Sequence, residues 1–140
     1  MKKNEPVTHI MTKDVLTVHV GQKLSDVRRI LEEKGIHHLP VVDGKKLIGI
    51  LSATDMMRLS FGAYGASDPR SLDAIMDHQF TISDAMKREV TTVDNHASVR
   101  DAANALKGGN FHAVPVVNGD RELLGIVTST DLIQYLLDQY

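Results

Sequence analysis

The chain has 140 residues, a formal net charge of −2 and 42% hydrophobic residues, which is enough for one compact core or two small packed lobes. It has neither cysteine nor tryptophan, so disulfides, thiolate metal sites and cysteine nucleophiles are excluded, and base-stacking surfaces are disfavoured. A mildly acidic balance argues against nucleic acid, and no apolar run approaches the roughly 20 residues of a membrane helix. We therefore expect a soluble, cytoplasmic protein without nucleic-acid or membrane partners.

The first predicted element is an amphipathic helix that starts at Leu24. Gly35 tolerates the left-handed conformation of a helix end, so the helix stops there. Two apolar, β-branched runs follow at 39–42 and 47–51, and the Asp43-Gly44 pair between them predicts a hairpin. The next helix carries Met56, Met57 and Leu59. The apolar face of the first helix consists of Leu24, Val27, Ile30 and Leu31.

Residues 62–80 are expected to form a structured linker. Gly62 and Gly65 break the preceding helix. Asp68 then serves as the N-cap, and Pro69 as a first-turn residue, of a short helix through Met76.

After the linker the chain repeats itself. The segment that ends at Gly44 aligns without a gap on the segment that ends at Gly119, and one extra residue near Glu122 restores the register of LIGILSATD on LLGIVTSTD. The second copy therefore predicts the same elements, with a helix that ends near Gly108-Gly109 and a hairpin of 114–117 and 123–127. Two copies are too few for a solenoid, so we expect two homologous lobes about an approximate two-fold axis. The apolar residues of its two helices are Val99, Ala102, Ala103, Leu106, Leu132, Ile133, Leu136 and Leu137.

The duplicated pattern resembles the tandem cystathionine β-synthase (CBS) domain pair. The resemblance covers nearly the whole chain and rests on PVVDG and PVVNG in the hairpins, and on the G-I-x-[ST]-x-x-D pattern that opens each following helix. It implies an α/β (α+β) fold of two β-α-β-β-α repeats, at 7–61 and 81–140, packed about a pseudo-two-fold axis into one module. Such pairs are mostly regulatory sensors of adenosine-containing ligands and are rarely catalytic.

The resemblance places ribose-binding residues at Ser52 and Asp55, and at Thr128 and Asp131. An acid in the first helical turn accepts hydrogen bonds from both hydroxyls of a ribose. The alternative is a capping box, in which Ser or Thr and an acid three residues later satisfy the helix end without a ligand. The two interpretations are compatible.

Three histidines are nominated as phosphate-binding residues. His37 and His112 occupy the same position in the two copies, and His38 lies beside the first. Basic residues at this position often reach the phosphates in similar sensors. The alternative is a structural role, since common ancestry also explains the duplication. Convergence of His37 and His112 on a metal is a weaker alternative, because the seven histidines show no ligand spacing.

By resemblance, apolar side chains would form the walls around the adenine, and the alternative for each is a place in the core. Val15 and Val90 are assigned to strands that lead into the copies. The full set is Val15, Ile36, Ile50, Val90, Phe111 and Ile126.

The expected function is regulatory: a non-enzymatic module that binds AMP, ADP, ATP or S-adenosylmethionine and signals to a partner protein, with no required cofactor or metal. The helix after each hairpin has more apolar residues than one small lobe covers, which predicts a homodimer. The alternative is that these helices cover the sheet of their own lobe. The alternative function is a ligand-free interaction module whose clefts are vestigial.

Overall fold

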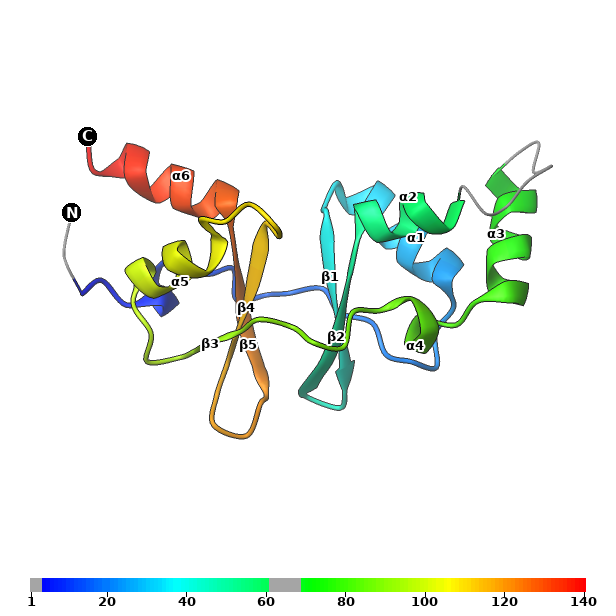
Figure 1. Cartoon of the computed structure of the whole chain (residues 1–140), viewed down its shortest axis with the longest axis horizontal. Coiled ribbons are helices and arrows are strands. Elements are labelled where there is room, and N and C mark those ends of the chain that lie inside the picture. Colours follow the sequence, from blue (N-terminus) through cyan, green and yellow to red (C-terminus); the bar gives the residue numbers. More distant parts are fainter. Residues whose placement is uncertain (1–3, 61–68) are drawn as a thin grey trace. The chain divides into compact units, whose positions relative to one another are not determined.

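Each copy of the repeat forms a helix, a hairpin and a second helix, as its pattern predicts (Figure 1). The computed structural model describes residues 4–60 and 69–140. The first copy contains α1 (Leu24–Lys34), β1 (His38–Asp43), β2 (Lys46–Ser52) and α2 (Ala53–Ser60). The second copy contains β3 (Val93–Asp94), α5 (Val99–Leu106), β4 (Ala113–Val117), β5 (Leu123–Thr128) and α6 (Ser129–Asp138). The remaining elements are the 3-10 turn η1 (Val7–His9) and helices α3 (Pro69–Gln79) and α4 (Ile82–Ala85).

A left-handed glycine follows the first helix of each copy, directly at the C-cap of α1 and two residues beyond the C-cap of α5. Gly35 follows α1 with a φ of 62°, and Gly109 lies just beyond α5 with a φ of 74°. Both angles belong to the left-handed region, where a side chain is strained and glycine is not. The turn lets the chain leave the helix and enter the buried hairpin strand.

The two sheets have the same order of pairing. In the second copy β3 runs parallel to β4, with Val93 opposite Val116, and β4 is antiparallel to β5. In the first copy β1 and β2 form the hairpin, and Val18 makes a single parallel bridge to Val41. The described residues thus form the mixed α/β architecture predicted from the sequence.

Val15 and Val90 do not lie on strands, which corrects their predicted placement. Pairing within each copy begins three residues later, at Val18 and Val93. The segments just before them pair elsewhere: Thr12 pairs with Ile126 of the second copy, and Lys87 pairs with Ile50 of the first. Each valine therefore lies between two paired residues of its segment, and its own backbone is not paired with a strand.

The chain divides into two compact units that exchange their leading segments. Of the described residues, the first-copy unit comprises 16–44, 48–60 and 69–89, and the second-copy unit comprises 4–15, 45–47 and 90–140. Ile82 and Met86, which begin the second copy, are buried in the core of the first-copy unit. Val7 is likewise buried in the core of the second-copy unit, beside Val114 and Val127. The core of each unit is therefore completed by the first residues of the other copy.

The linker helix α3 belongs to the first-copy unit. Its Met76 is fully buried in that core, and two carboxylates fasten the helix to α1. Asp73 accepts two 2.6 Å hydrogen bonds from the Arg28 guanidinium, and Asp77 accepts hydrogen bonds from the Ser25 hydroxyl and N–H. Hydrogen bonding to Asp73 raises the pKa of Arg28. The predicted helix is present and extends to Gln79.

Part of the predicted linker lies outside the described residues, namely Gly62, Gly65 and the proposed N-cap Asp68. Within residues 4–60 and 69–140, every helix is too short or too polar to cross a lipid bilayer.

Candidate functional site

The first candidate site, the Asp55 site, surrounds the junction of β2 and α2. Ser52 ends the strand, and its hydroxyl accepts a hydrogen bond of 3.1 Å from the N–H of Asp55. Asp55 Oδ2 accepts one of 2.9 Å from the N–H of Ser52 in return. This reciprocal capping box places a carboxylate with only 7% exposure at the start of a helix, where the dipole favours negative charge.

The second oxygen of Asp55 faces two cations. Asp55 Oδ1 lies 3.7 Å from Lys87 Nζ and 4.0 Å from Arg58 Nη1. Arg58 lies one turn further along α2, whereas Lys87 comes from the segment that pairs with β2. Both cationic side chains are mostly exposed, at 55% for Lys87 and 71% for Arg58. One oxygen of Asp55 is therefore held by the capping box, and the other faces two largely exposed cations.

The second candidate site, the Asp131 site, repeats the capping box at the junction of β5 and α6. Thr128 Oγ1 accepts a hydrogen bond of 3.2 Å from the N–H of Asp131, and Asp131 Oδ2 accepts one of 2.8 Å from the N–H of Thr128. Asp131 is half-buried. Among the described residues, Asp131 Oδ1 makes no hydrogen bond or ion pair, so this oxygen remains available.

A histidine stands beside each capping box. The carbonyl of His37 accepts a 2.9 Å hydrogen bond from the N–H of Ala53, the first residue of α2. The carbonyl of His112 accepts one of 3.0 Å from the N–H of Ser129, the first residue of α6. The structure thus brings the predicted phosphate and ribose residues of each copy together. His37 and His112 are exposed, whereas His38, the first residue of β1, is half-buried.

The predicted adenine-binding residues have mixed surroundings. Ile36 and Phe111 are half-buried and pack against the cores of their units, which agrees with the core alternative in part. Ile50 and Ile126 lie two residues before Ser52 and Thr128 on the same strands. Val15 and Val90 are half-buried and both belong to the second-copy unit.

Two glycines near the sites have a role that sequence reasoning missed. Gly49 and Gly125 lie inside the hairpin strands β2 and β5. A Cβ at Gly49 would lie 2.5 Å from Met86 Sδ, and one at Gly125 would lie 2.6 Å from Met11 Sδ. Glycine is needed because the exchanged segment passes directly over the strand. The matched recurrence of Met11 with Met86 and of Gly49 with Gly125 is the sequence signal of this packing.

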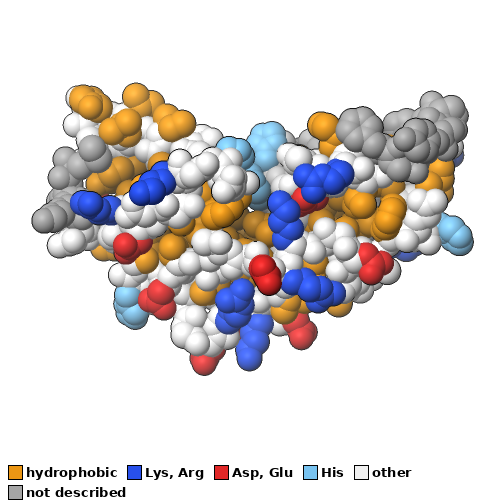
Figure 2. Space-filling view, viewed as in Figure 1, with side chains coloured by type: hydrophobic (Ala, Val, Ile, Leu, Met, Phe, Trp, Pro, Cys, Tyr) orange, Lys and Arg blue, Asp and Glu red, His pale blue; other side chains and the backbone are white. Residues whose placement is uncertain are grey.

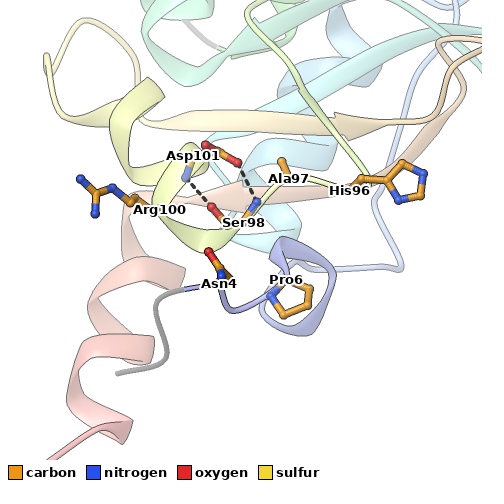
Figure 3. Close-up of a pocket in the computed structure, with 7 residues that line it drawn as sticks. All are labelled: Asn4, Pro6, His96, Ala97, Ser98, Arg100 and Asp101. Carbon is orange, nitrogen blue, oxygen red and sulfur yellow. Dashed lines mark hydrogen bonds between the residues drawn. The ribbon is translucent and has the colours of Figure 1, made fainter.

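A separate hollow of about 660 Å³ lies in the second-copy unit at the start of α5 (Figure 3). It contains none of the predicted site residues. Ser98 and Asp101 form a further capping box there, and hydrogen bonding with the backbone and then with the side chain of Ser98 lowers the pKa of Asp101. Figure 3 shows the side chains of Arg100 and His96 pointing away from each other. The hollow is lined by Asn4, Pro6, His96, Ala97, Ser98, Arg100 and Asp101.

No metal centre is built from the described part of the chain. Within residues 4–60 and 69–140, no three histidine or carboxylate side chains gather closely enough to hold an ion.

The sequence and the fold match those of known proteins. The model of the CBS domain family matches residues 7–62 and 82–138, which are the two copies. Protein MJ1225 of Methanocaldococcus jannaschii is 27% identical over 133 residues, which are 95% of this chain and 48% of that protein. The chain spans about half or less of the curated relatives that it matches first.

Solved structures with bound ligands share the fold over almost their whole length. The crystal structure of CBSX2 in complex with AMP has a TM-score of 0.80 and 26% identity, and covers 96% of this chain and 98% of its own. The CBS domain pair of protein MJ0100, in complex with 5′-methylthioadenosine and S-adenosyl-L-methionine, has a TM-score of 0.78 and 28% identity, and covers 98% of this chain and 99% of its own.

Proposed function

The chain belongs to the CBS domain family, and on that premise we propose that it is a regulatory module that binds an adenosine-containing ligand and signals its occupancy to a partner protein. The candidate ligands are AMP, ADP, ATP and S-adenosylmethionine. The module acts by binding and is not an enzyme. It works in the cytoplasm, in line with the cysteine-free composition.

One observation carries the proposal: each copy holds a helix-capping carboxylate beside a histidine at the end of the second hairpin strand. In each carboxylate Oδ2 is used by the capping box, and Oδ1 would accept the hydroxyls of a ribose. At Asp55 this second oxygen also faces Lys87 and Arg58. Ser52 and Thr128 would assist through their hydroxyls. The exposed imidazoles of His37 and His112, together with His38, would contact phosphates.

The apolar residues around these groups would contact the adenine. Ile36 and Ile50 belong to the first-copy unit, and Val15, Val90, Phe111 and Ile126 to the second. The complexes of CBSX2 with AMP and of MJ0100 with methylthioadenosine and S-adenosylmethionine support an adenosine moiety as the shared feature of the ligand.

A thermal-shift panel tests the proposed ligand class directly. The panel holds adenosine, AMP, ADP, ATP and S-adenosylmethionine, with guanosine and GMP as matched controls. A ligand present at 100 times its Kd adds about 2.7 kcal/mol to the free energy of unfolding and raises Tm. We expect a rise with at least one adenosine compound and none with its guanosine analogue. Equal Tm values across the panel would contradict ligand binding.

The ligand-free interaction module remains the alternative, and one observation favours it. The capping boxes of α2 and α6 are complete without a ligand, so neither helix needs one to form. A flat thermal-shift panel combined with dimer formation would support this alternative.

We also propose a homodimer, because α6 presents an apolar face that its own unit leaves uncovered. Figure 2 shows hydrophobic side chains gathered over this helix at the upper left. Ile133 is 59% exposed and Leu137 is 61% exposed, and Met57 on α2 is similarly uncovered. A second copy of the chain offers the same face in return, which suits an isologous contact.

A further inference from the structure

The two candidate sites share their capping boxes but differ in charge. Lys87 and Arg58 approach Asp55, and the register of the repeat places Thr12 and Gln134 at the equivalent positions of the second copy. Both are uncharged, and Gln134 donates its side-chain hydrogen bond to Asp138. Within the described residues, no cation pairs with Asp131. Counting the carboxylate and its paired cations, the Asp55 site has a charge of +1 and the Asp131 site has −1.

The cation at the Asp55 site is held in place by backbone pairing. The N–H of Lys87 donates to the carbonyl of Ile50, and the N–H of Ile50 donates to the carbonyl of Lys87, each at 3.0 Å. Met86 packs onto Gly49 beside this pair. The backbone of Lys87 is therefore fixed two residues from Ser52 on the neighbouring strand, while its exposed ammonium is free to reorient.

A bound ribose would compete with Lys87 and Arg58 for Asp55 Oδ1, because both cations face the oxygen that would accept the ribose hydroxyls. A phosphate group removes this conflict: it offers Lys87 and Arg58 a more highly charged acceptor and leaves Asp55 Oδ1 to the ribose. A nucleoside without phosphate offers the cations nothing in exchange. At the Asp131 site the preference for phosphate is reversed, because an unpaired carboxylate repels phosphate and attracts a positive charge.

We propose that the two sites select ligands of different charge. The Asp55 site, where Lys87 and Arg58 stand beside His37, favours an adenosine carrying phosphate. The Asp131 site has His112 without such a pair of cations, and it favours an uncharged or cationic adenosine derivative, such as a thioether or a sulfonium. The inference rests on the proposed function and adds to it the charge class of each ligand. The module would then compare two chemically different adenosine compounds.

Calorimetry on single-site variants tests the assignment. The Asp131→Ala variant keeps the Asp55 site intact, and the Asp55→Ala variant keeps the Asp131 site intact. With Asp131→Ala we expect ADP to bind about tenfold or more tightly than adenosine, since each charged hydrogen bond contributes about that factor. With Asp55→Ala we expect adenosine and S-adenosylmethionine to bind more tightly than ADP. The same ratio of ADP affinity to adenosine affinity in the two variants would overturn the proposal.

Substitution of the cations separates their role from folding. Adding Lys87→Met to Asp131→Ala should weaken ADP binding and so remove the preference for ADP, while adenosine should bind more tightly because one competing cation is gone. The matched surface variant Lys107→Met should change neither affinity. Adding Thr12→Lys and Gln134→Arg to Asp55→Ala should increase ADP affinity at the Asp131 site. Raised salt should weaken ADP binding and spare adenosine.

The outcomes also separate this inference from the function on which it rests. If the unsubstituted protein binds no adenosine compound, both fail. If it binds them while Lys87→Met lowers ADP and adenosine affinity equally, only the charge assignment fails and the adenosine-binding function stands.

Discussion

At the scale of single residues, the capping carboxylates show why a motif alone does not identify a site. Helices α2, α4, α5 and α6 all begin with Ser or Thr followed three residues later by Asp, and in each helix the two residues exchange hydrogen bonds. Asp84 and Asp101 serve their helices without a neighbouring histidine carbonyl bonded to the first turn. Asp55 and Asp131 differ because a hairpin strand ends at their cap and His37 or His112 pairs with the next residue.

The capping role of Asp101 gives a prediction for pH dependence. Hydrogen bonds from Ser98 lower the pKa of Asp101 below 3.8, so its stabilisation is fully present above the pKa of the unfolded chain and is lost as pH falls through the folded-state value. Asp101→Asn should therefore lower the free energy of unfolding at pH 7, and this difference should shrink towards pH 3.

Urea unfolding of both proteins at each pH measures the effect. Asp120→Asn, in the turn between β4 and β5, is the control for loss of an exposed charge. A difference between Asp101→Asn and the unsubstituted protein that stays constant from pH 7 to pH 3 would contradict the assigned pKa shift.

At the scale of elements, the exchanged segments predict an asymmetry among glycine variants. Gly125→Ala should destabilise the protein by about 1–3 kcal/mol, because the new Cβ would lie 2.8 Å from the backbone oxygen of Thr12 as well as against Met11. Gly119→Ala is the matched control, since nothing lies within 4 Å of its Cβ position. Equal Cm values for the two variants in urea would show that the segment does not pass over β5 as described.

The Arg28–Asp73 pair gives a second prediction about elements. Both side chains are half-buried and joined by two hydrogen bonds of 2.6 Å, so a double-mutant cycle with Arg28→Met and Asp73→Asn should give a coupling of about 1 kcal/mol or more. The exposed Arg29–Asp26 pair, at 3.5 Å, should give less than half of that value. A coupling energy of zero for Arg28 and Asp73 would contradict the claim that this pair joins α3 to α1.

Comparison of these elements with the sequence shows which features were predictable. The spacing of Leu24, Val27 and Leu31 and the glycine after Lys34 indicated α1, because helix periodicity and a left-handed end are local properties. The hairpins were equally readable from their β-branched runs. The exchange of the leading segments was not, because the pairing of Thr12 with Ile126 joins residues more than a hundred positions apart.

The same reason limited the prediction of the site. Ser52 and Asp55 are three residues apart, so their capping box followed from the motif. Lys87 approaches Asp55 because Lys87 pairs with Ile50, and no local sequence pattern predicts this pairing. The difference in charge between the two sites therefore became visible only in the fold.

At the scale of the whole molecule, the apolar face of α6 predicts self-association. Light scattering at micromolar concentrations should give twice the chain mass of 15.4 kDa. Leu137→Glu together with Ile133→Glu should reduce the mass to that of one chain, because buried charges without partners oppose the contact. Gln139→Glu, on the same end of the chain, controls for added charge. A monomer mass for the unsubstituted protein would contradict the dimer.

The central claim is that Asp55 and Asp131 bind the ribose of an adenosine compound. Titration calorimetry with AMP and with adenosine, on the unsubstituted protein and on the double variant Asp55→Ala and Asp131→Ala, tests it most directly. Asp84→Ala together with Asp101→Ala removes two capping carboxylates outside the sites and is the matched control. We predict that each lost site carboxylate weakens ligand binding by about 1–3 kcal/mol, while the control retains full affinity. Undiminished affinity in a folded Asp55→Ala, Asp131→Ala variant would contradict the claim.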